Sequence, residues 1–206
     1  MELTTTSYAL LGLLALRPWT TYELAQQAQR SLRLMWPVAE RQLYEQPKTL
    51  VRHGLASATG QRVGNRPRTV YAITPAGRQA LEDWLHETDG HFNVRSDILL
   101  RAFFSDQAGK NALHAQVEAL AAKVREGRRQ QVALYEADRD SPDGFLFPER
   151  RHLNGLMARL NLEIAGAVER WAEWVLLETA QWDERLEQPP DTDEFLARVF
   201  AIAEPD

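Results

Sequence analysis

The spacing of apolar residues in the first part of the chain predicts two short helices. Residues 4–16 are apolar on almost every side, which is typical of a helix that is buried all round. Thr20 stands three residues before Glu23, a capping-box pattern that opens a second helix. The side chains of this second helix that are expected to face the core are Tyr22, Leu24, Ala25 and Ala28.

A third helix is predicted to begin at Pro37, because proline suits the first turn of a helix. Its inward stripe follows the spacing i, i+4, i+7 and i+8 and consists of Leu43, Pro47, Leu50 and Val51. Pro47 lies inside this helix, where proline removes one backbone hydrogen bond and usually bends the axis. A kink or a short break is therefore predicted near residues 44–47.

After Gly54 the pattern changes to that of a β-hairpin. Residues 56–59 and 69–73 are predicted strands, and residues 60–68 between them are rich in turn formers and arginine. Thr74 and Pro75 then open a fourth helix. A helix followed by a basic two-stranded flap is what a winged helix-turn-helix needs to bind DNA.

Beyond a turn at residues 88–90, the pattern is helical again. Helices are predicted at about residues 96–105, 109–137, 149–185 and 193–203. The third of these carries a heptad seam, which requires a partner helix. The seam residues assigned to a dimer interface are Leu153, Met157, Leu160, Ile164, Ala167 and Trp171. Packing of the same seam against residues 113–134 of the same chain is the alternative.

These elements predict a mainly α protein with a small β-hairpin. Residues 1–88 are expected to form an N-terminal winged helix-turn-helix domain that binds DNA. Residues 91–206 are expected to form a C-terminal dimerisation domain of antiparallel long helices, with a ligand-sensing role in addition.

Formal charge is distributed unevenly along the 206 residues. Residues 1–78 contain ten Lys and Arg against four Asp and Glu, and residues 79–206 contain fourteen against twenty-five. The first part therefore carries +6 and the second −11, which together give the net charge of −5. Electrostatic fields act locally, so the basic residues 1–78 suit binding to a polyanion. The acidic residues 79–206 should lie away from that polyanion.

Several chemistries lack the residues that they need. The chain has no cysteine, so a disulfide, a thiolate metal site and a cysteine nucleophile are all excluded. It also has no phosphate-cradling glycine loop, HExxH motif or nucleophile-elbow serine, and its histidines are scattered. We therefore expect no enzymatic activity, metal or cofactor. The longest apolar run, residues 8–16, is too short to span a bilayer, and a cytoplasmic protein is expected.

Three groups of exposed side chains are predicted to contact DNA. On the third helix, the residues assigned to the groove edge and to phosphates are Arg41, Gln42, Tyr44 and Lys48. In the hairpin, the residues assigned to phosphates are Arg62, Arg66 and Arg68. At the start of the second helix, where backbone N–H groups favour anions, the residues assigned to a phosphate are Thr20 and Thr21. The alternative for each arginine is an ordinary solvated charge.

The chain resembles the PadR family of bacterial transcriptional regulators, in the branch with a longer C-terminal tail. The residues that carry the resemblance are Tyr8 to Leu14, Tyr22-Glu23-Leu24, Trp36-Pro37, Leu43-Tyr44, Gly54-Leu55 and Tyr71 to Arg78. Pro47 departs from the leucine or similar residue of the common family pattern. The resemblance implies a homodimer on a palindromic DNA operator, with repression as the family's habit.

Family members sense phenolic acids or flat hydrophobic drugs, and the resemblance therefore implies a small aromatic effector. Trp171 and Trp174 are the residues of this chain assigned to such a ligand, because aromatic rings stack on flat molecules. Tryptophans at heptad positions are also common in plain cores. The second functional hypothesis is a winged-helix module for protein interaction or scaffolding that does not bind DNA.

Overall fold

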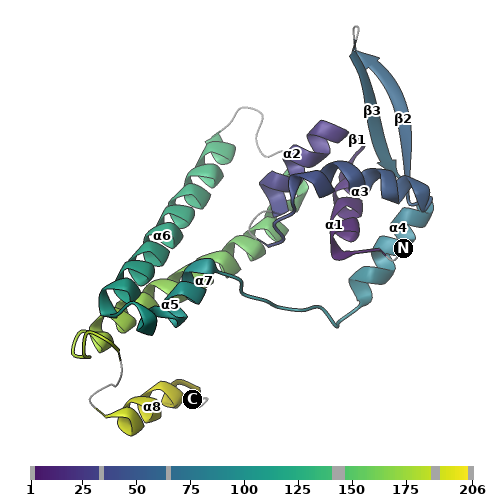
Figure 1. The fold of residues 1–206 in the computed structure, drawn as a ribbon. Coiled ribbons are helices and arrows are strands. Elements are labelled where there is room, and N and C mark those ends of the chain that lie inside the picture. The colour runs from purple at the N-terminus through teal and green to yellow at the C-terminus, as the bar shows by residue number, and fades with distance from the viewer. Residues whose placement is uncertain (1–2, 33–34, 64–65, 141–146, 187–190, 204–206) are drawn as a thin grey trace. The chain divides into compact units, whose positions relative to one another are not determined.

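A computed structural model describes residues 3–32, 35–63, 66–140, 147–186 and 191–203. The chain divides into two compact units, Met1–Phe92 and Asn93–Asp206. Figure 1 shows short helices and a long hairpin in the first unit and long helices in the second. The assignment of residues 1–88 to DNA binding and of residues 91–206 to dimerisation remains a prediction.

Unit 1 packs its helices around a leucine core. The helices are α1 (Thr5–Leu16), α2 (Thr21–Leu32), α3 (Glu40–Arg52) and α4 (Pro75–His86). α1, α2 and α3 supply fully buried leucines, namely Leu10, Leu11, Leu14, Leu24, Leu43 and Leu50. On another side of α1, the ring of Tyr8 stacks on Trp84 of α4 with 5.0 Å between ring centroids. The buried first helix and the inward stripe of the third are thus confirmed.

Helix α3 differs from the prediction in two respects, where it begins and whether it breaks near Pro47. It begins at Glu40 and not at Pro37, after an extended Ala39 that offers no side-chain cap. The helix also continues through Pro47, so it has no break there, and the alternative of a kink remains a prediction. The ring of Pro47 is fully buried. This burial offsets the single backbone hydrogen bond that proline removes.

The hairpin belongs to a three-stranded antiparallel sheet. The strands are β1 (Trp19–Thr20), β2 (Ala56–Val63) and β3 (Arg66–Ile73), in the order β1-β3-β2. Trp19 pairs with Tyr71, and both side chains are buried. β2 and β3 pair along their whole length, so much of the stretch predicted as turn is strand. The predicted turn residues 64–65 lie outside the described residues.

Gly77 lies where α3, the hairpin and α4 meet. The Thr74 hydroxyl donates to the Gly54 carbonyl at 2.7 Å and accepts from the Gly77 N–H at 3.1 Å, which caps α4. The Thr74 N–H donates to the Leu55 carbonyl at 3.1 Å. A Cβ on Gly77 would lie 2.0 Å from that same Leu55 oxygen. This close backbone approach fixes the base of the hairpin against α3 and α4.

Unit 2 is built on two long helices that lie side by side. Its helices are α5 (Asp97–Phe103), α6 (Lys110–Asp140), α7 (Arg151–Thr179) and α8 (Thr192–Phe200), with 3-10 turns at Ser105–Gln107, Pro148–Arg150 and Ala201–Ala203. His114 contacts Thr179, and Arg128 pairs with Glu169, so α6 and α7 run antiparallel. Small side chains form their shared core, namely Val117, Ala121, Ala172 and Val175. α7 ends at Thr179, earlier than the predicted residue 185.

The fold class is therefore the predicted one. It is mainly helical, with a small antiparallel sheet in a winged-helix unit and long antiparallel helices in a second unit. The one addition is strand β1, which the sequence pattern did not indicate.

Candidate nucleic-acid interface

Helix α3 presents a polar face opposite its buried stripe. Arg41, Gln42 and Lys48 are exposed on this helix, and Tyr44 is half-buried. The Lys48 ammonium lies 3.2 Å from the Glu45 carboxylate, and both side chains are mostly exposed. Such a pair is weak in water, so Lys48 can exchange Glu45 for another anion. The face therefore offers two cations, an amide and a phenol.

The arginines of the hairpin do not all lie on one side. Arg62 is opposite Pro67, and Arg68 is opposite Gln61. Because successive side chains of a strand point to opposite faces, Arg62 and Arg68 lie on opposite faces of the hairpin. Both side chains are exposed. Arg66 is in β3 and pairs with Val63, but its side chain lies outside what the structure describes.

A hollow joins the start of α2 to the hairpin. It has a volume of about 450 Å³ and is lined by Thr20, Thr21, Tyr22, Glu23, Pro67, Arg68 and Thr69. The structure thus brings together the predicted threonines and one predicted arginine. Arg62 is not among the lining residues, in keeping with its place on the other face of the hairpin.

Tyr22 was predicted to face the core, and this prediction is wrong. Its side chain is 62% exposed, and its hydroxyl accepts a hydrogen bond from Gln26 Nε2 at 2.7 Å. The helical period explains the error, because Tyr22 lies two residues from Leu24 and therefore on nearly the opposite side of α2. The same period could have shown that Tyr22 belongs with the exposed polar residues at the start of this helix.

The donors of Thr20 are directed to Glu23. The Thr20 N–H and hydroxyl donate to Glu23 Oε2 at 2.9 and 2.7 Å, and the Glu23 N–H donates back to Thr20 Oγ1 at 3.3 Å. The predicted capping box is confirmed. These hydrogen bonds from Thr20 hold the pKa of the Glu23 carboxyl below its ordinary value, with smaller help from Arg17 and Arg68. Contact of Thr20 with a phosphate remains a prediction.

Replacing Thr20 with alanine is expected to destabilise unit 1 by about 1 kcal/mol at neutral pH, because the cap and its hydrogen bonds are lost. The pKa of Glu23 is lower in the folded state, so the stabilisation is present above its ordinary pKa of 4.5 and is lost as the pH falls through the folded value. Urea unfolding of both proteins from neutral to acidic pH measures this. A difference that stays constant on acidification would contradict it.

Several apolar residues of the predicted dimer seam are exposed in the described part of the chain. Leu153, Met157, Leu160 and Ile164 are between 40% and 50% exposed. α7 instead packs on α6 through a neighbouring stripe that includes Ala165, Ala172, Val175 and Thr179. Of the seam residues, Ala167 is exposed, and Trp171 packs partly against the α6–α7 core.

Trp171 and Trp174 line one apolar pocket in unit 2, with a volume of about 630 Å³.

In the described part of the chain, no group of three or more His, Cys, Asp or Glu side chains is arranged to hold a metal ion. No helix among the described residues has both the length and the apolar character needed to cross a membrane.

Comparison with protein families gives two adjoining matches. Residues 10–83 match the model of the transcriptional regulator PadR-like family. Residues 94–179 match the model called virulence activator alpha C-term. The first match lies within unit 1, and the second lies within unit 2.

One curated relative is the negative transcriptional regulator PadR of Bacillus subtilis (strain 168). It is 28% identical over 100 residues, which are 47% of this chain and 54% of the relative. The match therefore spans about half the length of each protein.

Solved structures share the fold at low sequence identity. B. subtilis PadR in complex with operator DNA has a TM-score of 0.72 at 22% identity, covering 86% of this chain and 99% of that one. The Vibrio cholerae virulence activator AphA has a TM-score of 0.62 at 24% identity, covering 84% and 97%. B. subtilis PadR in complex with p-coumaric acid also has a TM-score of 0.62 at 24% identity, covering 82% and 92%.

Proposed function

Because the chain belongs to the PadR-like family of transcriptional regulators over residues 10–83, we propose that it is a dimeric, sequence-specific DNA-binding repressor. In this proposal α3 enters the major groove and the β2–β3 hairpin contacts phosphates. The protein acts by occupying an operator and not by catalysis. The cytoplasm, where DNA is accessible, is its proposed location.

The observation that carries the proposal is the exposure of cations on two elements of unit 1, helix α3 and the hairpin. Arg41 and Lys48 are exposed on α3, Arg62 and Arg68 are exposed on the hairpin, and Arg68 lines the hollow at the start of α2. Phosphate contacts of this kind fix a protein's register on the duplex, and base contacts then supply the specificity. Gln42 and Arg41 are the residues we assign to base edges.

The exposed seam of α7 supports a homodimer. Its apolar side chains Leu153, Met157, Leu160 and Ile164 lie outside the α6–α7 core and are 40–50% exposed among the described residues. A second copy can bury them by a two-fold contact, and such symmetry suits a palindromic operator. Leu153, Met157, Leu160, Ile164, Ala167 and Trp171 are the proposed interface residues.

We also assign effector binding to unit 2. Trp171 and Trp174 line the same apolar pocket, and their rings suit a small aromatic molecule. B. subtilis PadR, which shares this fold, has been solved with p-coumaric acid. Binding of an effector in this pocket would release the operator.

Titration of the full chain with duplexes from the region upstream of its coding sequence tests the proposal. One sequence is expected to bind more tightly than a scrambled duplex, and its affinity should fall about 10³-fold between about 50 and about 200 mM salt. Fluorescence anisotropy gives both quantities, and sedimentation gives the mass of the complex. A chain that stays monomeric and ignores every duplex at low salt would exclude the proposal.

The second candidate function is a protein-interaction or scaffold module. In this function the hairpin arginines are ordinary surface charges, and α3 does not bind DNA. Weak, salt-independent behaviour towards DNA would favour it. The positive charge of residues 1–78 favours the DNA-binding hypothesis, because these residues carry ten Lys and Arg against four Asp and Glu.

A further inference from the structure

Helix α3 carries one acidic side chain on the face that points away from the protein. At about 100° per residue, Glu45 lies nearly opposite the midpoint of the buried stripe that Leu43, Pro47 and Leu50 form. Its side chain is 60% exposed, so another molecule can reach the carboxylate. The residues predicted to contact DNA did not include Glu45, although it lies at the centre of the outward face.

The rotation of α3 about its own axis is fixed by contacts on the other sides of the helix. The Ser7 hydroxyl of α1 donates to the Gln46 amide oxygen at 2.9 Å, which ties one flank of α3 to α1. Thr49, on the turn after Glu45, is buried, and its hydroxyl accepts a hydrogen bond from the Arg52 guanidinium at 2.8 Å. Glu45 therefore cannot turn inward unless this packing is broken.

Cations surround Glu45 on the outward face. Arg41 lies one turn before it, Lys48 and Arg52 lie one and two turns after it, and all three are exposed. The Lys48 ammonium is 3.2 Å from the Glu45 carboxylate. Because both side chains of this pair are in water, Lys48 can exchange the carboxylate for a phosphate beside it. A carboxylate with three cations around it can thus be brought close to a polyanion.

The chemistry of a carboxylate restricts what Glu45 can contact on DNA. An ionised carboxylate accepts hydrogen bonds but donates none, so the oxygens of a phosphate repel it. In the major groove the donors are the amino groups of cytosine and adenine, whereas guanine N7 and O6 and thymine O4 are acceptors. The adenine amino group lies between two acceptors, and the cytosine amino group has one acceptor beside it. A carboxylate therefore suits cytosine best.

We infer that Glu45 reads a cytosine in each half of the operator, by accepting a hydrogen bond from the cytosine 4-amino group in the major groove, while Lys48 contacts a neighbouring phosphate. The inference rests on the proposed function, in which α3 enters that groove. It also gives the charge of Glu45 a second effect. Repulsion between the carboxylate and DNA that lacks this cytosine raises specificity while it lowers general affinity.

Selection from a randomised duplex pool with the full chain gives the preferred sequence, and fluorescence anisotropy then measures every base change in it. At one position of each half-site, cytosine should be preferred over the other bases by about tenfold. Glu45→Ala should reduce this preference to about twofold or less and leave the preferences at other positions in place. It should also bind a scrambled duplex about threefold more tightly, because a repelling charge is gone.

Glu45→Gln gives a result that a merely structural role for Glu45 would not produce. Glutamine keeps the length of the side chain, but its amide group both donates and accepts hydrogen bonds. This combination suits the amino group and N7 of adenine. The preferred base at the position that Glu45 reads should therefore change from cytosine to adenine, by about fivefold.

Glu82→Ala is the matched control for the loss of charge. Glu82 is also an exposed glutamate in a helix of unit 1, and it belongs to α4, outside the proposed interface. Its replacement should leave every base preference unchanged and alter the affinity for a scrambled duplex by less than about twofold. Circular dichroism checks that each variant is folded.

The results separate this inference from the proposed function. If the unchanged chain selects one sequence and binds it in a salt-dependent manner, but Glu45→Ala leaves all base preferences as they were, the repressor proposal stands and the contact with cytosine is wrong. Glu45 is then only a surface partner of Lys48. A preference for another base at the position that Glu45→Ala affects would also overturn the inference. If no common sequence is selected and no duplex binds at low salt, both proposals fail.

Discussion

Replacing Gly77 with alanine is expected to destabilise unit 1 by about 3 kcal/mol. The new Cβ would lie 2.0 Å from the Leu55 carbonyl oxygen and 2.9 Å from Ile73 Cγ1. The nearer atom belongs to the backbone, so a change of side-chain rotamer cannot relieve the clash. Either α4 moves away from the base of the hairpin, or the hydrogen bonds of Thr74 to Gly54 and Leu55 are lost. Urea unfolding of the full chain, followed by far-ultraviolet circular dichroism, measures the effect.

Gly12→Ala is the matched control for this substitution. Gly12 also lies in a helix of unit 1, and a Cβ there would meet no atom within 4 Å. Alanine at this position should raise stability by about 0.5–1 kcal/mol, because glycine is a poor helix former. If the two variants unfold at the same urea concentration, the close approach at Gly77 does not have the role that we assign to it.

The double substitution Arg62→Ala with Arg68→Ala is expected to reduce operator affinity on the order of 100-fold near 100 mM salt. A dimer would lose four cations that we place against phosphates. The slope of log affinity against log salt should therefore become shallower by about 3.6. Fluorescence anisotropy at several salt concentrations measures both effects, and circular dichroism checks that the fold is retained.

A second pair of arginines provides the control for charge alone. Arg78 and Arg95 are exposed and lie outside the proposed interface. Their replacement by alanine removes the same total charge, yet it should change the slope by less than about one unit, since distant charges are screened. Equal slopes for the two double variants would mean that the hairpin has no special contact with DNA.

Much of unit 1 could be predicted because its local signals agree with one another. Thr20 with Glu23, and Thr74 with Pro75, mark helix starts through interactions between near neighbours in sequence, and both form as expected. Strand β1 was missed because two residues are too few for any alternation to appear. Its existence depends on pairing with Tyr71 and Val70, which are far away in sequence.

The exposed residues of the hairpin could be predicted from the sequence, but their geometry could not, and their contact with DNA remains a prediction. Residue types indicated that Arg62 and Arg68 belong to one basic hairpin, but the register that places them on opposite faces depends on the length of both strands. Tyr22 was assigned to the core, although its position on the helix is exposed. Packing of α7 against α6 was the alternative given for the seam, yet the face that α7 uses is a stripe of small residues next to the seam.

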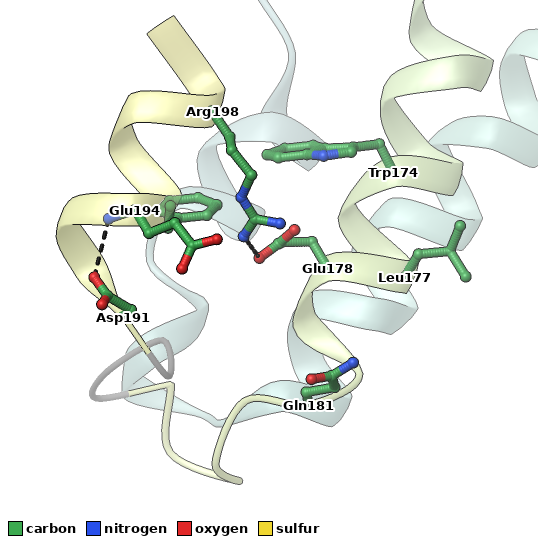
Figure 2. A pocket seen from close by; sticks show the side chains of 8 residues that line it. Trp174, Leu177, Glu178, Gln181, Asp191, Glu194 and Arg198 are labelled. Carbon is green, nitrogen blue, oxygen red and sulfur yellow. Dashed lines mark hydrogen bonds and ion pairs between the residues drawn. The ribbon is translucent and has the colours of Figure 1, made fainter. Parts of the chain in front are cut away.

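Helix α8 forms one wall of the proposed ligand pocket, through Phe195. It meets α7 through the Phe195 ring and through the Arg198 guanidinium, which Figure 2 shows beside Glu178, while the valines and alanines between α6 and α7 make up a different core. Substitutions along α8 can thus change the dimensions and polarity of the cavity without disturbing the scaffold that supports it. Changes in ligand preference can therefore arise through substitutions in α8, without changes in the proposed DNA-binding surface of unit 1.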